Sequence, residues 1–574
     1  MSTARIERVD SLPLILTWLL RMHIHTIIDG IWRPHGRWQG LNYGQLALLF
    51  VAYVIHQQIH RLMSMEGWLN DHRTVIEQVT GWMIGEKEAT DDRLGLLLDE
   101  LGHDEQKGIT LQQQVGRHLI QAYELPTKVG RYDTSSFSVH HAVPEEGEAL
   151  RELLRFGHSK DNQPGRLQFK QGLGTLDPAG IPLLTHTLSG EVADDGLYLP
   201  AWWQMRTTLG RNDFLFIADC KAAAMATRVG IASHKGFYLF PLPMTGETPA
   251  WLQAQISQAT TQEIVLPELV DKSGQHKVLG EGFVVERNMS YTQPDQRIFS
   301  WQEQWFVTRS HSLTARQQAS LQRRLVRTEQ ELQHMRAKTN ETLQAFTHRV
   351  HQTLDKRNMA EFLQVKIDET ITTVKRYLNP GRPGPNSPFT TETRSHFSLT
   401  IQRNETALAS ARQLAGWRIH VCNASSQQVD LIESVRYYRD EWLVEHGFHR
   451  FKNGSLPALP LYLHLPNRIR GLMLLLLIAL QALTLIDFVA QRSLAQENTE
   501  IAGLVPGNPK MKTSRPSAER LLAAFDKLHL VITEINGSIS GFLLESLSPL
   551  QCLILDLLRV PVSVYDLNFT RVPT

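Results

Sequence analysis

A carboxylate stands where the sequence predicts a buried strand. In RYDTSSFSVHH (131–141) the aromatic and β-branched residues predict a strand that enters a core, yet Asp133 lies inside it. A carboxylate that is buried without a partner is costly, so this residue needs a compensating charge. A bound metal ion would supply that charge and make the residue useful.

Two more acidic residues occur in settings that complement Asp133. Asp219 lies near the end of a second strand-like segment, DFLFIADCKAA (213–223), and Glu445 lies in a helical pattern at 437–454. Carboxylates on neighbouring strands lie close together, and a helix packed beside the sheet adds a third. Two divalent ions, about 3.5–4 Å apart and held by such oxygens, stabilise the attacking and leaving oxygens of a phosphodiester. Taken singly, each acid also fits a surface or hydrogen-bonded residue.

The helical pattern at 437–454 carries a recognisable signature. In YRDEWLVEHGFHRFK (438–452), Tyr438, Glu445 and Lys452 have the spacing Tyr-x2-Arg-x3-Glu-x6-Lys, with Glu441 at the arginine position. The chain resembles the DDE transposases of bacterial insertion sequences, in the branch with this signature. The resemblance covers about 40–530 and also includes the segments YDTSSFSVHH, GHSKDNQPGRLQF, DGLYLPAWW, FIADCKAAAMATR and LVPGNPK, the last followed by RPSAERLLAAF.

The resemblance implies a fold and an activity. The expected fold is an α/β multidomain one, with a ribonuclease H-like mixed sheet core that a β-rich insertion interrupts between Asp219 and Glu445. Asp133, Asp219 and Glu445 would be the catalytic residues and would hold two Mg²⁺ ions, which Mn²⁺ could replace. Water would cleave the transposon end, and the new 3′-hydroxyl would attack target DNA or first the opposite strand, giving a hairpin.

The resemblance also implies DNA contacts. Tyr438 and Lys452 match signature residues that contact DNA phosphates. Because Glu441 replaces the signature arginine, another cation would supply that contact; the candidates are Arg436, Arg439 and Arg450. In related enzymes the insertion helps to hold a DNA hairpin, sometimes with a tryptophan, and Trp301 and Trp305 are candidates, with core packing as the alternative. Lys160 and Asp161 in GHSKDNQPG fit either a role near the site or a structural turn.

The expected partners are double-stranded DNA with terminal inverted repeats, target DNA and a second copy of the chain in a homodimer. We expect a cytoplasmic, nucleoid-associated protein without a membrane anchor. Two other functions stay open: a nuclease of the same core that cuts without joining, and a catalytically silent DNA-binding descendant, which the departure at Glu441 allows.

Composition is compatible with these functions but does not select one. The 574 residues exceed one core and predict two to four domains. A formal net charge of +1 neither favours nor excludes nucleic acid, so only a local basic face would be informative. The three cysteines, Cys220, Cys422 and Cys552, are far apart and lack the spacing of a zinc site or a disulfide framework.

Patterning divides the chain into five parts. Residues 1–125 read as an all-helical domain that would bind the DNA ends, 126–229 as the first part of the catalytic core, and 230–430 as an insertion that is β-rich and then helical. Residues 431–498 complete the core, and 499–574 form a small helical tail. The apolar segment 471–490 resembles a membrane span in hydropathy, but Gln481 and Asp487 interrupt it, which favours a buried core helix.

Overall fold

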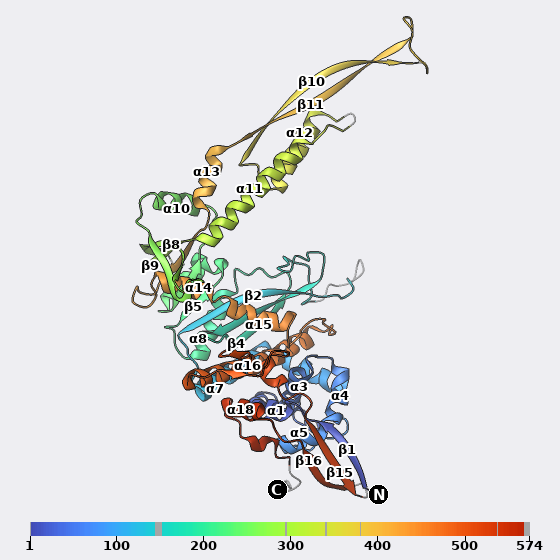
Figure 1. Cartoon of the computed structure of the whole chain (residues 1–574), viewed down its shortest axis with the longest axis vertical. Helices are drawn as coiled ribbons and strands as arrows, with labels where there is room; N and C mark the ends of the chain where they lie inside the picture. Colours follow the sequence, from blue (N-terminus) through green and yellow to red (C-terminus); the bar gives the residue numbers. More distant parts are fainter. Residues whose placement is uncertain are drawn as a thin grey trace.

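A mixed nine-stranded sheet runs through the centre of the molecule in the computed structural model, which describes residues 2–143, 152–292, 296–338, 341–378, 380–535 and 538–567 (Figure 1). The strand order is β4-β3-β2-β5-β6-β12-β9-β8-β7. These strands are β2 (Val129–Ser138), β3 (Gln168–Leu176), β4 (Ile181–Ser189), β5 (Leu215–Ala218), β6 (Phe237–Pro241), β7 (Gln262–Val270), β8 (His276–Thr292), β9 (Ile298–Ser310) and β12 (Trp417–Cys422). The structure thus confirms the coarser part of the predicted fold class: the chain is mixed α/β and contains a large mixed sheet.

Strand directions change at the middle of the sheet. β2, β3 and β4 form an antiparallel meander, whereas β5 and β6 run parallel to β2 and to each other. β12 is antiparallel to both β6 and β9, so it joins the strands of the insertion to the rest of the sheet. Strands β7, β8 and β9 of the insertion therefore extend the central sheet.

Helices cover this sheet, and two of them flank β2. α8 (Tyr198–Leu209) packs against β2 and β4, and α15 (Trp442–Lys452) packs against β2 and β3. The helical pattern predicted at 437–454 is in fact two helices, because α14 (Leu431–Arg439) ends at Asp440 before α15 begins. Aspartate is unfavourable in a helix interior, because its side chain competes for nearby backbone groups. Two short elements, η1 (Cys220–Ala223) and α9 (Met225–Ser233), follow β5.

The two ends of the chain form one body with the core. The N-terminal helices are α1 (Leu12–Arg21), α2 (Ile24–Ile31), α3 (Tyr43–Gln57), α4 (Leu62–Asp71), α5 (Arg73–Thr80), α6 (Asp91–His103) and α7 (Glu105–Tyr123). The C-terminal part has β13 (Ile501–Ala502), β14 (Lys512–Thr513), α17 (Ala518–Ala523), β15 (His529–Ile535), β16 (Ser538–Leu544), α18 (Pro549–Leu557) and η2 (Val562–Tyr565). One continuous hydrophobic core includes residues from both ends and from the sheet.

Two predictions about the chain ends are wrong. Residues 1–125 are not all helical, because β1 (Ser2–Arg8) pairs with β15, and the C-terminal tail is not only helical, because β15 also pairs with β16. The pairing joins residues at opposite ends of the chain, and Figure 1 shows β1, β15 and β16 together close to both termini. Local patterning does not predict such long-range pairing, since each strand depends on a partner that is distant in sequence.

The long apolar helix α16 (Pro466–Glu497) lies at the centre of the molecule, as predicted for a core helix. It packs against α3, α6 and β4, and glycines allow the close approach to α6: a Cβ on Gly471 would lie 2.2 Å from the Leu98 carbonyl oxygen. By length and composition it is the one described helix able to cross a membrane, or one of up to three candidates if two bent helix pairs each count as a span. Its most apolar window is 94% buried within the protein.

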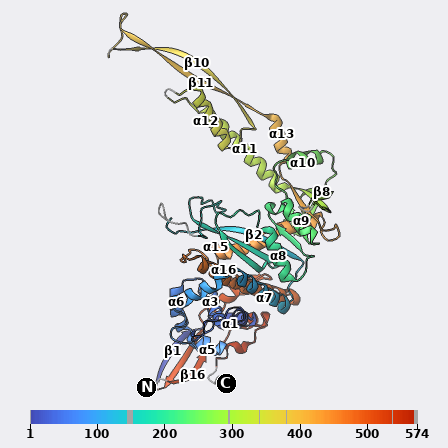
Figure 2. The same ribbon diagram turned by 180° about the vertical axis from the view of Figure 1, so that it is seen from behind.

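A long arm projects from the insertion (Figures 1 and 2). It consists of α11 (His311–Gln333), α12 (Leu343–Lys356), β10 (Leu363–Tyr377), β11 (Phe389–Arg403) and α13 (Glu405–Leu414), and α10 (Thr248–Ile256) lies near its base. A separate small core, which includes Leu325, Phe346 and Val350, holds the helices and the base of the β10–β11 ribbon together. The sequence indicates the helical part of the arm, whereas the ribbon is not predicted.

Candidate active site

Asp133 and Asp219 line one small cavity between adjacent parallel strands. The register pairs Tyr132 of β2 with Ala218 of β5, so the two aspartates follow at the same level of the sheet. Their shared cavity has a volume of about 20 Å³, which is room for one water-sized group. Two residues predicted from separate sequence segments are therefore brought together.

The surroundings of Asp133 favour a positive charge. The side chain is half-buried, and its Oδ1 lies 3.5 Å from the Lys160 ammonium nitrogen. Burial raises the pKa of Asp133 above its ordinary value; the Lys160 ammonium opposes this rise, and the Asp219 carboxylate adds to it. Lys160 therefore compensates only part of the cost of the buried carboxylate.

Asp219 is held in place by hydrogen bonds. It caps η1 by accepting a hydrogen bond from the Lys221 backbone N–H at 3.0 Å, and it accepts another from the Tyr198 hydroxyl at 2.5 Å. Burial and the Asp219 carboxylate together raise the pKa of Tyr198, so the hydroxyl keeps its proton and remains a donor. These two donors orient the carboxylate toward the cavity.

The helix α15 contributes two acids with different positions. Glu441, which precedes α15, lines the cavity together with Asp133 and Asp219, whereas Glu445 is exposed one turn further along. Burial, then Asp133 and then Glu445, raises the pKa of Glu441. The residue that departs from the signature is thus the helix carboxylate that the structure places on the cavity.

A lysine-rich network surrounds a fifth carboxylate next to the site. Asp194 is 2% exposed and accepts hydrogen bonds from Lys170 at 2.5 Å and Lys221 at 3.0 Å, while Lys160 lies 3.9 Å away. Burial alone would raise the pKa of Asp194, but the hydrogen bonds from Lys170 and Lys221 lower it to about 2. Asp194 is therefore an anion that fixes Lys160 and Lys221 beside Asp133 and Asp219.

The acidic residues of the cavity are the type of ligand that a hard divalent cation such as Mg²⁺ binds. They are carboxylates, and burial raises the pKa of both Asp133 and Glu441; a neighbouring carboxylate adds to each rise, Asp219 to that of Asp133 and Asp133 to that of Glu441. Across the described residues, no three His, Cys, Asp or Glu side chains are grouped closely enough to hold a metal ion together. Magnesium sites often use only one or two carboxylates and complete their coordination with substrate phosphates and water. Asp133 and Asp219 fit such a pair.

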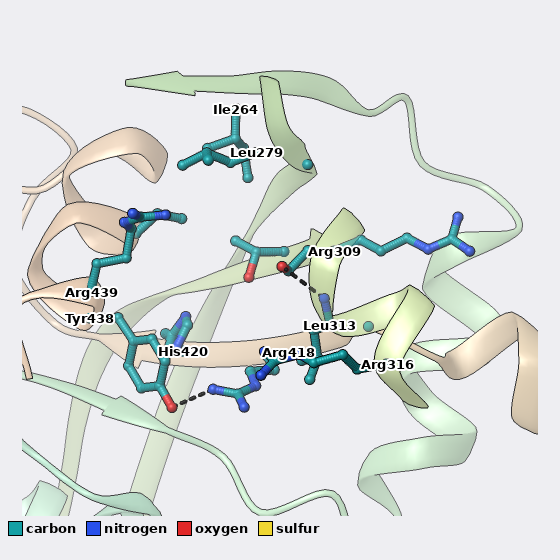
Figure 3. A pocket seen from close by; sticks show the side chains of 14 residues that line it. Ile264, Leu279, Arg309, Leu313, Arg316, Arg418, His420, Tyr438 and Arg439 are labelled. Carbon is teal, nitrogen blue, oxygen red and sulfur yellow. Dashed lines mark hydrogen bonds between the residues drawn. The ribbon is translucent and has the colours of Figure 1, made fainter. Parts of the chain in front are cut away.

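A second, basic cavity adjoins the first and shares Tyr438 with it (Figure 3). This arginine cavity has a volume of about 230 Å³ and is lined by Arg309, Arg316, Arg418 and Arg439, among others. Arg418, on β12, donates a hydrogen bond to the Tyr438 hydroxyl. A cation thus lies beside the signature tyrosine although the signature arginine is replaced.

A buried histidine also lines the arginine cavity. His420 is 1% exposed, and neither ring nitrogen has a hydrogen-bond partner among the described residues. Burial and the nearby Arg418 lower the pKa of His420 to about 3, so the ring is neutral at physiological pH. The cavity therefore offers cationic guanidinium groups and a neutral imidazole, a set that suits an anionic group such as a phosphate.

The remaining predicted DNA contacts lie in three different settings. Lys452 pairs with Asp161 at 2.7 Å and lies over the Phe137 ring, on the side of β2 that faces α15. Arg436 pairs with Glu268 on the surface. Arg450 is 1% exposed and pairs with acids of α16 and α17, so the structure does not place it where DNA could reach it.

Both candidate tryptophans are tied to a buried ion pair. Trp305 is 8% exposed and donates a hydrogen bond to Glu303, and Trp301 donates to the same carboxylate and to Tyr238. Glu303 in turn pairs with Arg228 at 2.8 Å. These contacts support the packing alternative for both tryptophans.

The sequence reasoning missed several residues around the site. Asp194, Lys170, Lys221, Tyr198 and Arg418 were not predicted. The pair Asp194–Asp195 in EVADDG was a weak signal, because two adjacent acids before a helix also fit a surface turn. Nothing local distinguishes Arg418, which is recruited by strand pairing of β12.

The raised pKa of Asp133 predicts a pH-dependent gain in stability for Asp133→Asn. A folded-state pKa above the unfolded value means that wild-type stability is lost as pH rises through the folded pKa. Without metal, we expect Asp133→Asn to raise Tm by roughly 1–3 °C at about pH 8 and by less at about pH 5. Asp213→Asn is the control of opposite sign, because Arg211 lowers the pKa of that carboxyl. A gain that is larger at the lower pH would contradict the expectation.

Comparison with known proteins adds no identification. No protein-family model matches the chain, and no curated protein matches it. The functional conclusion therefore depends on the residues, contacts and strand order described above.

Proposed function

We propose that the chain is a DDE transposase, which cleaves DNA at transposon inverted repeats and joins the ends to target DNA. One observation carries the proposal: Asp133, on β2, and Asp219, directly after the parallel neighbour β5, line a single cavity. Two carboxylates placed in this way suit the divalent ions of phosphodiester chemistry, which carboxylates and substrate phosphates hold together.

The strand order supports a ribonuclease H-like core. An antiparallel meander, β2-β3-β4, flanked on the β2 side by the parallel strands β5 and β6, is the arrangement expected of that fold. The first aspartate lies in the first strand of the meander and the second directly after the next parallel strand. The β-rich strands and the arm between β6 and β12 agree with the expected insertion.

Each residue of the site has a role in this proposal. Asp133 and Asp219 would hold the divalent ions, which would supply stabilisation of charge on the attacking and leaving oxygens. Tyr198 and the Lys221 backbone N–H keep the Asp219 carboxylate oriented. Lys160 donates hydrogen bonds to Thr134 and lies between Asp133 and Asp194, so its ammonium group compensates part of the charge of Asp133.

Phosphate contacts come from the residues next to the cavity. Tyr438 lines both cavities, so a phosphate beside the two aspartates would lie close to the arginine cavity. Arg418 and Arg439 supply the positive charge that the signature arginine gives in the resembling enzymes. Lys452 also binds DNA in this proposal. A DNA phosphate would replace its present partner, Asp161.

The remaining expectations follow from the same proposal. The N-terminal helices bind the inverted repeats, a homodimer holds two ends, and the protein acts in the cytoplasm on the nucleoid. These parts are supported only by the resemblance to DDE transposases.

Two substitutions on α15 separate the roles of its acids. We expect Glu445→Gln to abolish cleavage, and Glu441→Gln to retain cleavage within about tenfold at saturating Mg²⁺ but to need several-fold more Mg²⁺ for half-maximal rate. The reason is that Glu441 adds negative charge to the cavity without occupying the signature glutamate position. Cleavage rates across a Mg²⁺ titration measure both. If Glu441→Gln is inactive and Glu445→Gln is active, Glu441 is the third ligand.

Joining distinguishes this function from its alternatives. A labelled duplex with the gene's own flanking end, incubated with the protein, Mg²⁺ and a target plasmid, should yield covalent end–plasmid joints through the 3′-hydroxyl. Cuts without joints would select the nuclease that cuts only. Binding of the end without cuts in either Mg²⁺ or Mn²⁺ would select the silent descendant.

A further inference from the structure

The outer part of the β10–β11 ribbon has no partner within the chain. The small core of the arm covers the ribbon only at its base, as far as Ile367 and Phe397. We call residues 370–378 and 380–396 the outer ribbon. At about 3.3 Å per residue, its paired strands extend roughly 25 Å beyond this support, and Figure 1 shows the ribbon reaching past α12.

An uncovered two-stranded ribbon of this length is unusual in isolation. A hairpin of two strands is at best marginally stable in water, and packing on one face is normally needed. Here both faces are exposed, and apolar side chains remain uncovered, with Ile371 at 63% and Leu378 at 61% exposed. These features indicate a surface that is covered by a partner.

The charge of the outer ribbon selects the kind of partner. The sequence of this segment has four basic residues, Lys375, Arg376, Arg382 and Arg394, and a single acidic one, Glu392. The whole chain is almost neutral, with a net charge of +1, so the excess is local. Lys375, Arg376 and Arg382 are exposed, and in the described part of the ribbon none of the three pairs with a carboxylate. A polyanion complements this surface better than a second copy of a neutral chain.

Shape and side-chain types favour duplex DNA as the polyanion. A two-stranded ribbon fits the major groove, which is about 12 Å wide. Threonines line both strands and, with the cations, are suitable donors to phosphate oxygens. The turn carries four exposed prolines, Pro380, Pro383, Pro385 and Pro388. DNA-binding proteins insert proline and other apolar side chains as wedges between base steps from the minor-groove side.

We propose that the outer ribbon binds duplex DNA, with Lys375, Arg376 and Arg382 on phosphates and the proline-containing turn against the groove. This inference rests on the proposed function, because it assumes that DNA is the substrate of the same chain. The ribbon would extend the DNA-binding surface well beyond the catalytic cavity.

Salt-dependent binding tests the inference. Full-length protein and a labelled duplex with the gene's flanking end are mixed in EDTA, so that cleavage does not intervene, and affinity is measured across a salt series. Each phosphate contact contributes about 0.9 to the slope of log affinity against log salt. For Lys375→Ala/Arg376→Ala/Arg382→Ala we expect the slope to fall by about 3. The matched control, Lys510→Ala/Lys512→Ala/Arg515→Ala, removes three exposed cations elsewhere and should change it by less than about 1.

A photo-crosslinker at Leu378 identifies the occupant directly. We expect adducts with the duplex; adducts only with a second copy of the chain would overturn the inference in favour of a dimer contact. An unchanged slope in the ribbon variant, or an equal fall in the control, would also overturn it.

The inference and the proposed function fail in different ways. If the wild type cleaves DNA and the slope is insensitive to the ribbon, only the inference fails. If the slope depends on the ribbon but no Mg²⁺-dependent cleavage occurs, the inference holds and the transposase proposal fails. A wild type that binds no DNA overturns both.

Discussion

Replacing Asp219 by Asn is expected to reduce Mg²⁺-dependent cleavage of an end-containing duplex by about 10³-fold or more, and Asp133→Asn should have a similar effect. Each substitution keeps the shape of the side chain and removes the negative charge that would hold a divalent ion. The effect should be large because the two aspartates line the same cavity and no other described carboxylate except Glu441 lines it with them.

A matched control separates catalysis from stability. Asp213 is two residues before β5, its side chain is 60% exposed, and it pairs with Arg211 outside the cavity. Asp213→Asn should therefore cleave at the wild-type rate. Cleavage by Asp219→Asn within tenfold of the wild type, with both variants folded, would show that the active site lies elsewhere.

Replacing Arg450 by Met is expected to lower the free energy of unfolding by about 3–5 kcal/mol. The guanidinium is 1% exposed and bonds to Asp487 at 2.8 Å, to Glu519 at 2.9 Å and to Thr484 at 3.1 Å. Its removal leaves the half-buried carboxylates of Asp487 and Glu519 without their cation. Burial raises the pKa of Asp487 to about 6, although the Arg450 guanidinium opposes this rise. The arginine therefore already stabilises the charged form of this carboxyl in the wild type.

Scanning calorimetry measures this effect as a fall of several degrees in Tm. Arg439→Met is the control, because that arginine is exposed and lines the arginine cavity; its Tm should stay within about 1 °C of the wild type while DNA affinity falls. If Arg450→Met melts like the wild type and loses DNA binding, Arg450 is a DNA ligand and its ion pairs are dispensable.

Local patterns predicted the parts of the fold that depend on short segments. The aromatic and apolar runs of β2 and β5 indicated strands, and the placement of Asp133 and Asp219 in or near them predicted their proximity. This worked because a parallel strand pair brings equivalent positions to one level of the sheet. The buried helix α16 was also evident, since its apolar run is interrupted by only a few polar residues.

Features that depend on distant partners were not predictable in the same way. β1 is a strand because β15 pairs with it, and Arg418 reaches Tyr438 because β12 joins the sheet beside β6. Arg450 and Trp305, two of the candidate DNA contacts, are buried; Arg450 pairs with Glu519 and Trp305 donates a hydrogen bond to Glu303, and no spacing rule contains these contacts. Glu441, by contrast, could be singled out from the sequence, because it occupies the arginine position of the signature. The structure adds that its carboxylate lines the same cavity as Asp133 and Asp219.

The most direct test of the account is cleavage of a supercoiled plasmid that carries the gene's flanking ends. Purified full-length protein would be incubated with it in Mg²⁺ or in EDTA, and the breaks would be mapped at nucleotide resolution. A DDE transposase should give Mg²⁺-dependent breaks at the element ends that leave 3′-hydroxyl groups. Breaks that persist in EDTA, or that fall at random positions, would contradict it.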